Sequence, residues 1–105
     1  MEIRKTEIFA KILNTVANET ELTSEQILSC CRTAETVDAR YILVYLLKRE
    51  GIYIREIARM MKFSRRGVEK MLSQFDNRLT QSGPLFEITL KRIANKLRIY
   101  SELSH

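Results

Sequence analysis

The sequence lacks several features on which metal centres and disulfide-stabilised folds depend. It has no tryptophan, a single histidine, His105, and only two cysteines, the adjacent Cys30 and Cys31. A zinc site needs four ligands, and a disulfide framework needs several cysteines spread along the chain. We therefore expect no metal, no cofactor and no disulfide, with both thiols reduced and partly buried.

Long apolar runs and catalytic motifs are also missing. The longest apolar run, Tyr41 to Leu47, has seven residues, whereas a helix that crosses a bilayer needs about 20. The N-terminal residues mix acids and bases and show no secretory signal, which leads us to expect a cytoplasmic protein that is not held in a membrane. Because the sequence shows no histidine–carboxylate pair, cysteine–histidine pair or glycine-rich phosphate loop, we also expect no enzymatic activity.

Glycine and proline are scarce, with three and one among 105 residues, and this scarcity favours helices. Hydrophobic residues make up 45% of the chain and charged residues 30%, which is typical of one small globular domain. Apolar residues recur at spacings of three and four over residues 3–17, whereas residues 41–47 are apolar on every face. The sequence therefore predicts a single all-α domain over residues 1–105, a bundle of five or six helices around a central core helix.

Capping signals indicate where several of these helices begin and end. Thr23 followed by Gln26 forms a capping box for a short second helix, and Thr33 is suited to cap the third. Gly51 is expected to end that third helix in the left-handed conformation. The first helix is expected over about residues 2–18 and the last, which has Pro84 in its first turn, over about residues 84–101.

A helix-turn-helix is expected over about residues 54–80. Two apolar stripes are out of phase with each other across residues 62–64, and Ser64 is a good cap for the second helix. In this motif the second helix enters the major groove of DNA. Lys62 stands where many such turns have glycine, so a left-handed turn there would cost about 1 kcal/mol. A turn that avoids positive φ is the alternative.

The positive charge is concentrated in one segment. The chain has a net charge of +5. Residues 48–70 alone hold eight bases and three acids, a difference of +5, whereas residues 1–47 carry a net charge of −2. Clustered bases favour phosphate binding because they release counterions from nucleic acid. A solvated helix face is the alternative interpretation.

Core and basic positions between Leu22 and Leu79 together form a recognisable pattern. Its residues are Arg32, Ala39, Arg40, Tyr45, Leu46, Arg49, Glu50, Glu56, Ile57, Arg59 and Val68. With these residues the segment resembles the C-terminal DNA-binding domain of the bacterial replication initiator DnaA, a Trp-repressor-like helix-turn-helix family. The resemblance implies that Arg32 enters the minor groove and that Arg40 lies near the phosphates. Residues 64–67 depart from the family's Asp-His-Thr-Thr stretch, and the turn is one residue shorter, so the family's target sequence is not implied.

The sequence therefore predicts a non-enzymatic protein that binds double-stranded DNA, sequence-specific or architectural. Its expected role is transcription or replication regulation, with a mobile element as one setting. The residues expected to read bases are Ser64, Arg65, Arg66 and Glu69. Those expected to contact phosphates or the minor groove are Arg32, Arg40, Lys48, Arg55, Lys62 and Lys70.

Other functions remain open at this point. The stretch SRRGVEKML also resembles the recognition helix of sigma-factor region four and of response regulators, which would place the chain beside RNA polymerase. A helical protein-interaction module is a third interpretation.

Apolar residues in the last helix form a two-heptad seam, for which packing within the chain is preferred to a zipper. A homodimer through the first or last helix is left open. The seam residues are Phe86, Leu90, Ile93, Leu97 and Tyr100.

Overall fold

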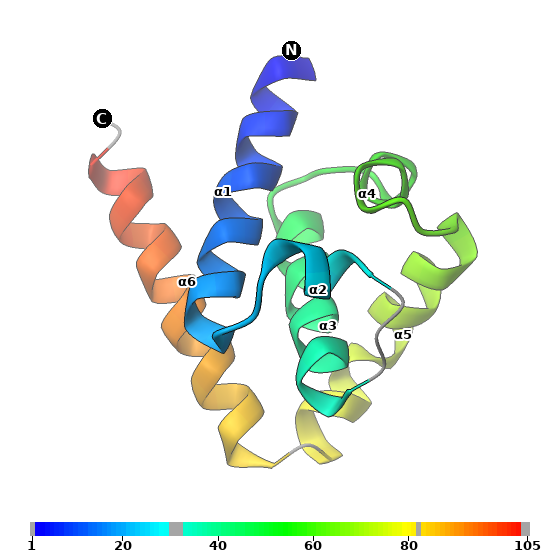
Figure 1. The fold of residues 1–105 in the computed structure, drawn as a ribbon, viewed down its shortest axis with the longest axis vertical. Helices are drawn as coiled ribbons and strands as arrows, with labels where there is room; N and C mark the ends of the chain where they lie inside the picture. Colours follow the sequence, from blue (N-terminus) through cyan, green and yellow to red (C-terminus); the bar gives the residue numbers. More distant parts are fainter. Residues whose placement is uncertain (1, 30–32, 82, 104–105) are drawn as a thin grey trace.

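Helices make up almost all of the computed structural model, which describes residues 2–29, 33–81 and 83–103 (Figure 1). The described residues contain no strand. They form α1 (Glu2–Thr20), α2 (Ser24–Leu28), α3 (Ala34–Arg49), α4 (Ile54–Met61), α5 (Arg65–Gln81) and α6 (Pro84–Leu103). The all-α class is confirmed, and the first and last helices each extend two residues beyond their predicted ends.

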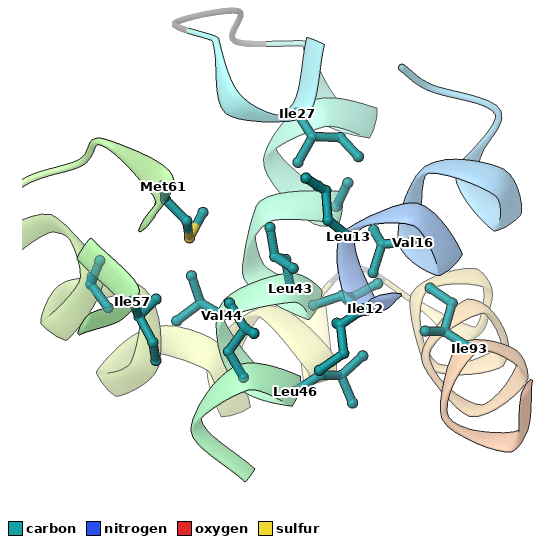
Figure 2. Packing of buried hydrophobic residues seen from close by; sticks show 14 of the residues in the cluster. Ile12, Leu13, Val16, Ile27, Leu43, Val44, Leu46, Ile57, Met61 and Ile93 are labelled. Carbon is teal, nitrogen blue, oxygen red and sulfur yellow. The ribbon is translucent and has the colours of Figure 1, made fainter. Parts of the chain in front are cut away.

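α3 is the centre of the bundle and contacts each of the other five helices. Ile42, Leu43 and Val44 are each at most 1% exposed. Because successive residues of a helix point about 100° apart, burial of three in a row means that α3 is covered over most of its circumference, and the half-buried Tyr41 and Tyr45 lie on the remaining side. Figure 2 shows Val44 on the side of α4 and Leu46 on the side of α1. The predicted central core helix is therefore confirmed.

Three helices end with a left-handed residue followed by an apolar one. The left-handed residues are Glu21 after α1, Gly51 after α3 and Lys62 after α4, with φ of 58°, 88° and 60°. In each case the next N–H donates to the carbonyl five residues earlier: Leu22 to Ala17, Ile52 to Leu47 and Phe63 to Ala58. This capping pattern satisfies carbonyls that the helix leaves unpaired, and it confirms the role predicted for Gly51.

The predicted helix starts are also confirmed. The Thr23 hydroxyl accepts from the Gln26 N–H at 3.0 Å, and the Thr23 N–H donates to the Gln26 side chain at 2.9 Å, which completes a capping box. The Thr33 hydroxyl accepts from the Thr36 N–H at 3.3 Å at the start of α3. These bonds fix the starts of α2 and α3.

α6 packs back along α1 and closes the bundle (Figure 1). Phe86 and Ile93 are buried, and Leu90 and Leu97 are half-buried against the core, so these four seam residues pack within the chain. Tyr100 lies beyond the part of α6 whose side chains are described. The Glu19 side chain of α1 is 9% exposed and forms ion pairs with Arg92 and Lys96 of α6. In the described ranges, no helix is long and apolar enough to span a membrane.

Candidate nucleic-acid interface

α4 and α5 pack against each other and are joined by three residues, Lys62, Phe63 and Ser64. Both helices turn apolar residues inward: Ile57, Ala58 and Met61 from α4, and Val68 and Phe75 from α5. The break predicted at residues 62–64 is confirmed. The connection leaves the start of α5 at the surface, where Arg65 and Arg66 are exposed.

The connection reverses direction at Lys62, which adopts the left-handed conformation with φ 60° and ψ 37°. Its N–H donates to the Arg59 carbonyl at 3.3 Å, and the Phe63 N–H donates to the Ala58 carbonyl at 3.0 Å. The alternative turn without positive φ is therefore wrong. The backbone keeps the geometry that glycine would favour, although the residue there is an exposed lysine.

Ser64 caps α5, as the sequence predicts. Its Oγ accepts a hydrogen bond from the Gly67 N–H at 3.0 Å. A Cβ placed on Gly67 would lie 3.1 Å from that oxygen, which is a tight contact, so glycine makes room for the cap. The cap uses one of the two acceptor lone pairs of the Ser64 oxygen, so the other lone pair and the O–H can still meet a ligand.

The outward side of α5 carries Arg66 and Lys70. These residues are four apart, and they lie opposite the buried Val68 and Phe75 on the helix. Among the described residues, neither of the two bases takes part in an ion pair. Arg65 lies to one side and pairs with Glu69 at 3.5 Å, with both side chains more than half exposed. Arg66 and Lys70 are therefore the bases of α5 best placed to meet a ligand.

The C-terminal half of α5 is anchored to the rest of the bundle. The Arg78 Nε donates to the Asp38 Oδ1 of α3 at 2.6 Å. The Phe75 ring stacks on Tyr45 of α3 with ring centroids 4.2 Å apart, and it meets Phe86 of α6 at 5.8 Å. These contacts fix the direction of α5 at one end, while the outward side of its first turns faces solvent.

α4 adds a second row of bases. Arg55, Arg59 and Lys62 follow one another at spacings of four and three, so they lie on one stripe of the helix and its end, and all three are exposed. Arg59 also pairs with Glu56 at 2.5 Å. We use the term basic segment for the six bases of α4, the turn and α5, which are Arg55, Arg59, Lys62, Arg65, Arg66 and Lys70.

The remaining two bases of residues 48–70 lie outside the basic segment. Lys48 and Arg49 are exposed in the last turn of α3. Arg49 lines a groove between α1 and α6, so it lies apart from the six bases of the basic segment. The eight bases of residues 48–70 are therefore divided between the basic segment and the end of α3. Arg32, which the resemblance places in the minor groove, lies outside the described residues.

The prediction that Arg40 lies near phosphates is corrected. Arg40 is 8% exposed, and its guanidinium donates to the carbonyls of Ile27 at 2.6 Å and of Ser29. It also lies over the Phe63 ring at 5.7 Å. Arg40 therefore connects the end of α2 to the α4–α5 turn. Its partner carbonyls are 11 and 13 residues away along the chain. No sequence pattern at such a separation indicates a hydrogen bond between a side chain and a carbonyl.

Tyr53 is an exposed aromatic residue beside the basic segment. It is 65% exposed and precedes α4, where its side chain makes no capping hydrogen bond. Tyr41 and Tyr45 do pack against the core. In the sequence, the one indication that Tyr53 is exposed is that no good capping residue stands before α4.

Replacement of Arg40 by methionine is expected to destabilise the protein by about 2 kcal/mol or more, because two carbonyls lose their charged donor. The matched control is Arg55→Met, which changes an exposed arginine and should stay within about 0.5 kcal/mol of the wild type. Urea denaturation followed by circular dichroism measures both changes. Equal stability of the two variants would contradict the structural role of Arg40.

Replacement of Lys62 by glycine is expected to give a more stable protein than replacement by alanine. Both changes remove the charge, but only glycine adopts φ 60° without steric cost, so the expected difference is about 1 kcal/mol. The same denaturation experiment measures it. If the alanine variant is as stable as the glycine variant, the turn does not have the left-handed geometry described here.

The chain was compared with protein-family models, with curated proteins and with solved structures. No protein-family model, curated protein or solved structure matches it. A functional assignment therefore depends on the residues and geometry set out above.

Proposed function

We propose that the protein binds double-stranded DNA through its basic segment and has no catalytic role. The observation that carries the proposal is that all six bases of this segment are exposed on two adjoining helices. By contrast, Arg40 and Arg78 are held by partners inside the bundle. Exposed, clustered bases favour phosphate binding through counterion release.

In this proposal α5 enters the major groove with its N-terminal turns. An α-helix fits the major groove, which is about 12 Å wide. Arg66 then faces base edges and can donate two hydrogen bonds to guanine O6 and N7, a contact worth about 1–3 kcal/mol of discrimination. Glu69 lies one turn from Arg66 on the same exposed side and can accept from a cytosine amino group.

Phosphate contacts are assigned to bases around α5. Arg55 lies on α4, Lys62 lies at the end of α4, and Lys70 lies one turn after Arg66 on α5. Such contacts fix the position of the protein on DNA without reading sequence. The ion pair of Arg65 with Glu69 is exposed and therefore weak, so Arg65 is able to exchange this partner for a phosphate.

The resemblance to the DnaA C-terminal domain supports the same role, since in that family a helix-turn-helix presents its second helix to duplex DNA. We extend the proposal to regulation of transcription or replication on this basis. The departure at residues 64–67 means that the target sequence would be this protein's own. Arg40 is left out of the proposed DNA contacts because its guanidinium is already bound to backbone carbonyls.

The proposal predicts DNA binding that weakens steeply with salt. With about four phosphates neutralised, affinity for a fluorescein-labelled random duplex should fall roughly a hundredfold between 50 and 200 mM salt, as measured by fluorescence anisotropy. Lys62→Ala and Lys70→Ala should each lower the slope of log affinity against log salt by about 1.

The control for this experiment is Lys91→Ala, which removes an exposed base from α6, far along the chain from the basic segment. Its salt slope should equal that of the wild type. No binding at 50 mM salt would reject the DNA function, and an equal effect of Lys91→Ala and Lys70→Ala would reject the assigned surface.

A further inference from the structure

A groove of about 1380 Å³ lies between α1, α6 and the end of α3. α1 and α6 pack closely along part of their length and diverge towards the N-terminal end of α1 (Figure 1). Apolar side chains line the groove, among them Ile8 and Ile12 of α1 and Leu97 of α6. Ile8 and Leu97 are only half-buried, so the existing helices do not fully cover this apolar surface.

The charged residues of the groove are mostly basic, with five bases against two acids, Glu7 and Glu50. Two of the bases are engaged, since Lys91 pairs with Glu87 at 3.3 Å and Arg92 with Glu19 at 3.7 Å. The other three are Lys11, Arg49 and Arg98, one from each of α1, α3 and α6. Within the described ranges no ion pair involves these three.

We propose that this groove docks an amphipathic helix with acidic flanks, supplied by a partner protein. A helix laid in a groove buries an apolar stripe made of residues at i, i+3, i+4 and i+7. The apolar lining would receive that stripe, and Lys11, Arg49 and Arg98 would meet acidic residues beside it. The groove exceeds the roughly 300–1,000 Å³ of small-molecule pockets, which favours a helix over a small ligand.

The charge of the groove also distinguishes between occupants. A symmetric pair of copies meeting through this face would bring two net-positive surfaces together, which is unfavourable. Duplex DNA has the required negative charge but no apolar stripe for the lining of Ile8, Ile12 and Leu97. An acidic amphipathic helix satisfies both properties of the groove, and this proposal is independent of the DNA function.

The test is selection from a displayed library of 16-residue helical peptides against the full chain. Each round includes counter-selection against the Arg49→Glu/Arg98→Glu double variant, whose two sites are exposed and outside the core. Enriched peptides should carry apolar residues at i, i+3, i+4 and i+7 with Asp or Glu beside them. The strongest peptide, labelled and measured by anisotropy, should bind the double variant at least tenfold more weakly than the wild type.

The matched control is Arg66→Glu/Lys70→Glu, which reverses two exposed bases on α5 and should leave peptide affinity within twofold of the wild type. Circular dichroism checks that both double variants stay folded. Three results would overturn the proposal: no enrichment over the counter-selected variant, enrichment of basic or non-periodic peptides, or equal loss in both double variants. Light scattering that shows a dimer dissolved by the groove variant would assign the groove to a second copy instead.

Discussion

The burial of α3 over most of its circumference determines how the other helices are arranged. Because Ile42, Leu43 and Val44 point in three directions and are each at most 1% exposed, other helices must cover most of the circumference of α3. α1, α2 and α6 cover part of it, and α4 and α5 cover the rest. Each outer helix therefore buries one stripe and leaves the opposite stripe to solvent. The exposed bases of α4 and α5 are a direct result of this arrangement.

The bases of the chain serve two distinct purposes. Arg40, Arg78 and Arg92 each hold together two parts of the bundle through a hydrogen bond or an ion pair. The bases of the basic segment lie outside the core, and Arg66 and Lys70 make no ion pair with any described residue. Because Arg78 and Phe75 fix the far end of α5, its first turns are presented from a rigid support. Such support is what a recognition surface requires.

Much of the fold could be predicted because it depends on neighbouring residues. The features that could not be predicted depend on contacts between residues far apart in the sequence. The cap at Thr23, the left-handed Gly51 and the break before Ser64 depend on neighbouring residues, and all three are confirmed. The burial of Arg40 depends on carbonyls at the end of α2, which no spacing rule brings into contact with it. Likewise, Arg49 follows Lys48 directly, yet it lines the groove between α1 and α6, because its direction is set by how the helices pack. In the candidate site, exposure of the bases was predictable, but their division between two surfaces was not.

The central claim is that duplex DNA contacts α4, the turn and the start of α5. The most direct measurement is the change in backbone amide chemical shifts of ¹⁵N-labelled protein on titration with a duplex taken from in vitro selection. The largest changes are expected over residues 55–70, with α1 and the second half of α6 little affected. Changes centred on α1 and α6, or none at saturating DNA, would contradict it.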